Sequence, residues 1–245
     1  MNLSRMLRRG LSITVLLAAF LFLVAACNGE EATPIPVPTP TLGELLSNAG
    51  EKMGAMSTAK FSMADENESG AKFFGTTFKS LEAEVKAPDS FRMVVDVVAP
   101  GFGFVQIEMM AVGDQAFMKL SKDAPWASLP LDQVPFNFAG LGTTLQDLLN
   151  RIEDGTITGT EAVLDIQAYR VETSITSEEL SDLITSVDSG HTVNLTLWID
   201  EAGHALRQIK IDGQLYDDDA PETVRLVIIE AVDIPVEIEL PDIGS

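Results

Sequence analysis

The sequence is poor in the residues that carry most enzyme chemistry. Its 245 residues include one cysteine, Cys27, and two histidines, His191 and His204. A single cysteine excludes a disulfide within the chain, and two histidines without a His-Glu-x-x-His pattern argue against zinc catalysis. The chain also has no Gly-x-Ser-x-Gly nucleophile elbow. These absences predict a protein that is not an enzyme and that holds no metal and no cofactor.

Basic residues are also scarce. There are 16 lysine and arginine residues against 37 aspartate and glutamate residues, which gives a formal net charge of −21. Residues 1–26 hold three of the basic residues and no acidic one, so the rest of the chain has a net charge of about −24. Nucleic-acid binding needs a basic surface, so nucleic acid is excluded as a partner. The same charge disfavours anionic lipid headgroups.

A long apolar run lies at the N-terminus. Three arginines among the first nine residues precede an apolar stretch from Leu11 to Val24, which ends in two alanines and Cys27. This order is typical of a secretory signal peptide, and its end matches the bacterial lipobox. We therefore expect residues 1–26 to be a lipoprotein signal peptide and Cys27 to be lipidated, with an ordinary secretory signal as the alternative. A lipid at Cys27 would hold the protein outside the cytoplasm, on the outer face of the cell membrane.

The lipidated cysteine is followed by a proline-rich tether. Between Pro34 and Pro40, proline alternates with other residues. Such a composition favours an extended, semi-rigid chain, so residues 27–41 are expected to be a spacer. Residues 42–245 then form one domain, which is long enough to build a core without disulfides.

Three segments of this domain have helical patterns. The first begins at a Thr41-x-x-Glu44 capping box and continues with apolar residues at helical spacing as far as Met56. The second covers residues 141–152. The third begins at a Thr176-x-x-Glu179 capping box and reaches Val187, which predicts a short helix.

The remaining segments alternate in polarity as strands do. Short turns between them predict an antiparallel sheet and an α+β fold. Residues 93–98 and 226–229 are apolar on both faces, which predicts either apolar neighbours on each side of the sheet there or a position at a closely packed seam. Four or five strands are expected between residues 59 and 120, and others at 157–175, 193–199, 206–211, 224–231 and 236–240.

Together these features resemble the LppX/LprG family of bacterial lipoproteins, relatives of the LolA/LolB fold. The resemblance covers nearly all of Thr41–Pro241 and rests on local features in the same order, each of them weak alone. They are the lipobox with its tether, the first helix running into Thr58–Phe61, Ala116–Lys119 followed by Pro125-Trp126, Gly140-Leu141 leading into Leu148-Leu149, Leu197–Asp200, and the closing Ile234–Pro241.

The resemblance implies a strongly curved antiparallel half-barrel with helices packed on its concave face. It also implies an apolar cavity between sheet and helices that takes the acyl chains of a lipid or glycolipid. The protein would then carry that lipid across the cell envelope, with a membrane transporter as a possible partner. The alternatives are an envelope sensor of the same fold that signals to a partner, a hydrolase, and a structural protein with a filled core.

The candidate cavity residues come from the first helix, the central strands and the second helix. Methionines suit a pocket that accepts chains of varied shape, although each of them also fits an ordinary core. Trp126 and Trp198 are candidates for the cavity rim. The predicted lining is Met53, Met56, Met93, Val95, Val97, Val105, Ile107, Met109, Leu145 and Leu149.

An acidic loop is the departure from the family pattern. Asp217, Asp218 and Asp219 follow one another, with Asp212 and Glu222 nearby. These carboxylates are potential Ca²⁺ ligands, but their spacing matches no EF-hand loop. We interpret the loop as a solvated acidic turn.

Overall fold

The structure is a computed structural model that describes residues 39–73, 75–134, 136–138 and 140–243. The predicted signal peptide, Cys27 and the tether up to residue 38 lie outside the described residues. The folded unit begins at Pro40.

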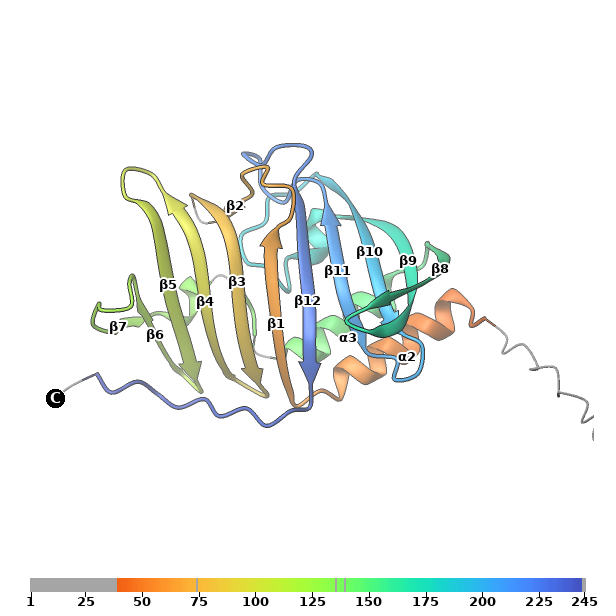
Figure 1. Cartoon of the computed structure of the whole chain (residues 1–245), viewed down its shortest axis with the longest axis horizontal. Coiled ribbons are helices and arrows are strands. Elements are labelled where there is room, and N and C mark those ends of the chain that lie inside the picture. The colour runs from red at the N-terminus through yellow and green to blue at the C-terminus, as the bar shows by residue number, and fades with distance from the viewer. Residues whose placement is uncertain (1–38, 74, 135, 139, 244–245) are drawn as a thin grey trace, which may run out of the picture. The chain divides into compact units, whose positions relative to one another are not determined.

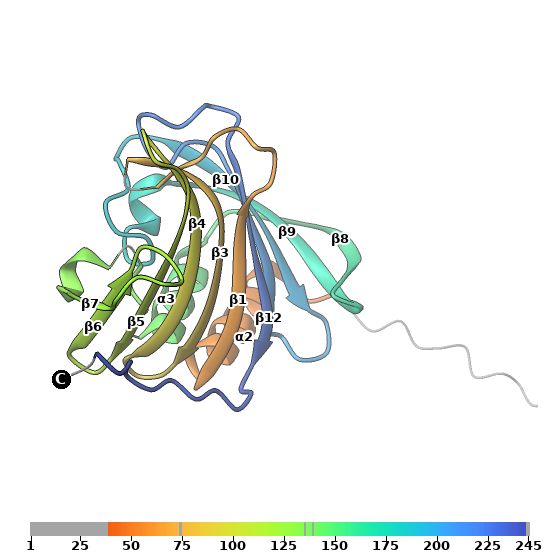
Figure 2. The ribbon, with the colours of Figure 1, turned by 60° about the vertical axis from the view of Figure 1, so that its left-hand side comes forward.

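The domain is built on one large antiparallel sheet. The strands are ordered β7-β6-β5-β4-β3-β1-β12-β11-β10-β9-β8, with the short β2 added beside β3. Because β7 and β8 lie at opposite ends of this order, the sheet is open and forms a curved half-barrel, not a closed barrel (Figures 1 and 2). The predicted α+β half-barrel is thereby confirmed. The strands are β1 (Thr58–Asp65), β2 (Lys72–Phe73), β3 (Thr76–Lys86), β4 (Ser90–Ala99), β5 (Gly103–Val112), β6 (Gln115–Lys119), β7 (Ala127–Leu129), β8 (Thr156–Val163), β9 (Ile166–Thr176), β10 (Thr192–Asp200), β11 (Leu206–Asp212) and β12 (Val224–Val232).

The two halves of the chain meet where the first strand pairs with the last. β1 lies between β3 and β12, and Met63 is opposite Val227 in the β1–β12 ladder. Elsewhere, neighbours in the sheet are mostly neighbours in sequence, as short hairpin turns require. The β1–β12 seam therefore joins the sheet halves formed before and after residue 141.

Two helices cover the concave face of the sheet, α2 (Leu42–Gly54) and α3 (Leu141–Arg151). The capping box predicted for α2 is present, because the Thr41 hydroxyl accepts a hydrogen bond from the Glu44 backbone N–H and the Glu44 carboxylate accepts one from the Thr41 N–H. The helices approach closely at Gly142, where an added Cβ would lie 2.5 Å from the Met53 carbonyl oxygen. Figure 2 shows both helices inside the curve of the sheet.

The closing strand predicted at residues 236–240 is wrong, because this segment has no regular structure. The chain leaves the sheet at Asp233, whose φ of 57° ends the β12 ladder. The Asp233 N–H donates to the Thr58 carbonyl and its carboxylate accepts from the Ser57 N–H. The segment beyond it then runs past the ends of β1, β3 and β4, where β1 has both of its edges already paired (Figure 1).

The predicted third helix is shorter than expected. Its capping box forms, with the Thr176 N–H donating to Glu179 at 2.8 Å, but it opens only a single 3₁₀ turn, η3 (Ser177–Leu180). Ile184 instead makes an isolated β-bridge with Phe136, which draws the chain out of a helical path.

The expectation of apolar cover on both faces of residues 93–98 is also wrong. Met93, Val95 and Val97 are buried on the concave side, whereas Val98 on the other face is 37% exposed. Val94 lies opposite Glu82 and Glu108, so the outer face places this valine among long acidic side chains.

Candidate functional site

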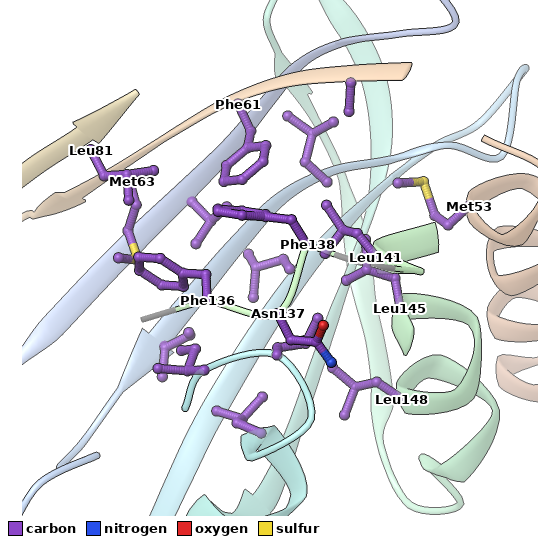
Figure 3. Close-up of a pocket in the computed structure, with 18 of the residues that line it drawn as sticks. Met53, Phe61, Met63, Leu81, Phe136, Asn137, Phe138, Leu141, Leu145 and Leu148 are labelled. Atoms are coloured by element: carbon purple, nitrogen blue, oxygen red, sulfur yellow. The ribbon is translucent and has the colours of Figure 1, made fainter. Parts of the chain in front are cut away.

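An apolar pocket lies between the concave face of the sheet and the helices. Its cavity volume is about 90 Å³, and about 830 Å³ of space lies between the lining residues when the open mouth is counted. Figure 3 shows side chains from α2, α3 and several strands converging on it. The lining consists of Met53, Met56, Ala59, Phe61, Met63, Leu81, Phe136, Asn137, Phe138, Leu141, Leu145, Leu148, Leu180, Leu183, Ile184, Leu195, Ile209, Ile211, Val227 and Ile229.

The lining is almost free of polar groups. Among these residues, Asn137 is the only one with a polar side chain, and none carries an ionisable group. The side-chain amide of Asn137 points toward Leu148 of α3 (Figure 3). A wall of this kind can desolvate hydrocarbon but offers little to a charged molecule.

One wall of the pocket is a chain segment that crosses the concave face. The Asn137 N–H donates to the Leu183 carbonyl at 3.1 Å, beside the Phe136–Ile184 bridge. The ring of Phe138 lies 5.8 Å from that of Phe61 and 4.6 Å from that of Phe91, measured between centroids. These aromatic contacts fix the segment against the sheet and separate the pocket from the β4–β5 half.

The structure distributes the predicted lining residues over two core clusters. Met53, Met56 and Leu145 line the pocket, and Leu149 packs in the same cluster without reaching the pocket wall. The other six belong to or pack against the second cluster, which also contains Val134 and Phe138. Met93, Val95, Val97 and Met109 are buried in that cluster, to which Phe138 of the crossing segment also belongs. Val105 and Ile107 pack against it and are partly buried.

Sequence reasoning missed the lining residues on β1, β11 and β12. Phe61 and Met63 alternate on β1, and Val227 and Ile229 alternate on β12, so the inward faces of both strands were readable. What was missing was the pairing of β1 with β12, since no local pattern shows that strands 160 residues apart are neighbours.

Neither tryptophan lies in the pocket wall. The Trp198 indole N–H donates to Glu161, and Trp198 is buried away from the concave apolar row. Lys119 lies over the ring of Trp126, with its Nζ 5.0 Å from the ring centroid.

A small space with a cavity volume of about 10 Å³, enough for one water-sized group, adjoins the pocket and shares Met63, Phe136 and Ile184 with it. Arg225 and Tyr216 also line this space. Two nitrogen–oxygen distances of 2.8 Å join the Arg225 guanidinium to Asp219, and both side chains are buried. Burial raises the pKa of Tyr216 to about 12 against the opposing effect of Arg225, so its hydroxyl is protonated at neutral pH.

The interpretation of residues 217–219 as a solvated turn holds for two of the three carboxylates. Asp217 and Asp218 are exposed, but Asp219 is buried. Its carboxylate accepts hydrogen bonds from the backbone N–H groups of Lys72, Leu215 and Tyr216 as well as from Arg225. In the part of the chain that the structure describes, no group of three or more acidic, histidine or cysteine side chains is arranged to hold a metal ion.

Comparison with known proteins identifies the class of this fold. Residues 43–244 match the family described as LppX_LprAFG lipoprotein. The chain therefore belongs to this lipoprotein family, and the resemblance read from the sequence is confirmed. No curated protein sequence gives a significant match. Within the described residues, no helix is both long enough and apolar enough to span a bilayer.

Two solved structures share the fold. LprF from Mycobacterium bovis superimposes with a TM-score of 0.65 at 16% identity, covering 83% of this chain and 98% of its own. The Mycobacterium tuberculosis lipoprotein LppX superimposes with a TM-score of 0.53 at 15% identity, covering 82% of this chain and 100% of its own. At these identities the likeness concerns the arrangement of sheet and helices.

Proposed function

We propose that this protein binds a lipid or glycolipid by its acyl chains and carries it across the cell envelope. The observation that supports this most directly is the apolar pocket between the sheet and the helices, in whose lining Asn137 is the only polar side chain. Moving hydrocarbon from water into such a site gains about 0.8 kcal/mol for each buried CH₂ group. Hydrocarbon can therefore bind there without any charged contact.

The charge of the protein supports the same mode of binding. The formal net charge of −21 disfavours capture of an anionic headgroup by the surface as a whole. The acyl chains are then the part of a lipid that the pocket recognises.

The proposal places the protein on the outer face of the cell membrane, anchored by a lipid at Cys27. Membership of a lipoprotein family and the sequence that ends at Cys27 support this location. A carrier in this position would receive its lipid at the membrane, where a membrane transporter is a fitting partner.

Binding without catalysis is part of the proposal. The described lining has no nucleophile, acid or base, so a lipid chain in the pocket would meet no group that could attack it.

A tryptophan that fills the pocket tests the proposal. Ile209 on β11 faces the pocket, so Ile209→Trp should occupy chain volume at little cost in stability. We expect lipid extracted from the purified variant, measured by mass spectrometry, to fall well below that from wild type, while the melting temperature stays close.

Val95→Trp is the matched control. Val95 is 0% exposed in the second cluster, where no pocket accommodates the ring. Overpacking there should cost about 1–3 kcal/mol of folding stability without removing chain-binding volume. If wild-type protein from its own host carries no lipid, or if Ile209→Trp retains the full load, acyl-chain binding in this pocket is refuted.

A further inference from the structure

Strand β12 places a charged residue in an apolar row. Arg225, Val227 and Ile229 alternate along the strand and therefore face the same side of the sheet. Val227 and Ile229 line the pocket, and Arg225, next in the row, is 2% exposed. A guanidinium thus stands at the end of this row, in the small space that adjoins the pocket.

Only part of this guanidinium is used within the protein. Its Nη2 donates to both oxygens of Asp219 at 2.8 Å and lies 3.3 Å from the Lys72 carbonyl oxygen. Its Nη1 is buried and has no hydrogen-bond partner among the described residues. Arg225 therefore contacts Asp219 and Lys72 through Nη2, and its Nη1 can donate a hydrogen bond to a bound ligand.

The hydroxyl of Tyr216 is in the same situation. It is buried, it has no partner in the described part of the chain, and the Arg225 guanidinium lies over its ring at 5.7 Å from the centroid. Both residues line the small space that adjoins the pocket. We call these two donors, Arg225 Nη1 and the Tyr216 hydroxyl, the polar end wall of the pocket. A buried donor without a partner is costly, so the two donors indicate a place for an acceptor.

The charges at this end wall select the kind of acceptor. Arg225 is already neutralised by Asp219, and Asp188 and Asp218 add negative potential at Tyr216. An additional carboxylate or phosphate would meet no net positive charge here. A neutral oxygen that only accepts hydrogen bonds fits both donors.

We propose that Arg225 Nη1 and the Tyr216 hydroxyl donate hydrogen bonds to the ester carbonyl of an acyl lipid whose chain lies in the apolar pocket. This inference rests on the proposed function and names the part of the lipid that the inner end of the pocket recognises.

Affinities for three probes of equal chain length test the end wall: methyl palmitate, hexadecane and palmitate. They are measured on the purified protein at pH 7 by displacement of a fluorescent acyl probe. Wild type should bind the ester more tightly than the alkane and the carboxylate. Tyr216→Phe removes only the hydroxyl, so it should weaken ester binding about fivefold, the worth of one hydrogen bond, and leave hexadecane unchanged.

Two further variants complete the design. Tyr169→Phe removes the hydroxyl of the chain's other tyrosine, which packs against the core outside the pocket lining, and should leave all three affinities unchanged. Arg225→Lys retains a positive charge for Asp219 but removes Nη1, so it should also reduce the preference for the ester over hexadecane.

The outcomes separate the two proposals. If wild type binds hexadecane and the ester equally, or if Tyr216→Phe and Arg225→Lys both retain the ester preference, the end wall is refuted while acyl binding stands. A buried water would then be the partner of these donors. If wild type binds none of the probes, acyl binding in the pocket fails and this inference fails with it.

Discussion

Asp219 shows how one side chain can hold a whole loop. It lies in the connection between β11 and β12, and its two oxygens accept from three backbone N–H groups and from Arg225. The hydrogen bond from Lys72 ties this loop to the start of β2, far away in the sequence. The carboxylate therefore acts as an internal anchor for the end of the sheet near the proposed end wall.

Removing the charge of Asp219 should be severe. Asp219→Asn leaves the buried Arg225 guanidinium without its counter-ion, and losing one partner of a buried pair costs about 3–5 kcal/mol. The measurement is chemical denaturation at pH 7. Asp218→Asn is the control, because Asp218 is exposed in the same loop and should change stability by no more than about 0.5 kcal/mol. Similar stabilities for the two variants would contradict the anchoring role.

At the scale of elements, the contact between α2 and α3 decides how the concave face is covered. Gly142 in the first turn of α3 lies directly against the last turn of α2. The same two helices supply Met53, Leu145 and Leu148 to the pocket. The spacing of the helices therefore sets the width of the pocket.

Gly142→Ala should push these helices apart. The new Cβ would lie 2.5 Å from the Met53 carbonyl oxygen, a contact that backbone atoms can relieve only by moving. We expect a loss of about 1–3 kcal/mol in the free energy of unfolding, measured by denaturation.

Gly43→Ala is the matched helix control. Nothing lies within 4 Å of a Cβ built at Gly43 in α2, so alanine should be neutral or stabilising by up to about 1 kcal/mol. A stable Gly142→Ala variant would show that the helices are not held at this distance.

At the scale of the whole molecule, the two halves of the open sheet are joined by its first and last main strands, which lie far apart in the sequence. β1 and β12 pair along Ala59–Asp65 although nearly the whole domain separates them. The clasp at Asp233, which accepts from Ser57 and lies 3.2 Å from Lys52 Nζ, ties the end of β12 to the region after α2. Hydrogen bonds donated by the Ser57 backbone N–H and by Lys52 lower the pKa of the exposed Asp233 carboxyl group. This clasp therefore holds the exit of the chain from β12 beside its entry into β1.

The proposed lipid anchor determines where in the cell the protein is held. Cys27→Ala should abolish lipid attachment, because the chain has no other cysteine that could carry the lipid. Intact-mass analysis of membrane-extracted wild type should show a lipid-modified N-terminal cysteine, whereas the variant should remain an uncleaved precursor or appear as soluble protein. The folded domain of the variant should melt as wild type does, which distinguishes loss of the anchor from misfolding. An unmodified Cys27 in wild type would refute the anchor.

Much of the fold could be predicted from the sequence because its signals are local. The capping box at Thr41 begins α2 where expected, and the inward row Phe91, Met93, Val95 is buried as its alternation predicts. The prediction of a strand at residues 236–240 is wrong because alternation in the sequence does not provide a partner strand. The helix predicted after Thr176 is too long because Ile184 pairs with Phe136 in a β-bridge.

The sequence by itself determined the class of the fold, the inward faces of the strands and the apolar character of the core. Only the tertiary structure decided where that core is open. Phe136 and Phe138 of the crossing segment pack against the β4–β5 half, while the pocket opens beside the seam of β1 with β12. Arg225 stands in the same alternating row as Val227, yet its pairing with Asp219 and its free Nη1 depend on a loop that folds back over the sheet. Burial of a side chain follows from periodicity, but empty space and unsatisfied donors follow from which distant segments arrive to cover it.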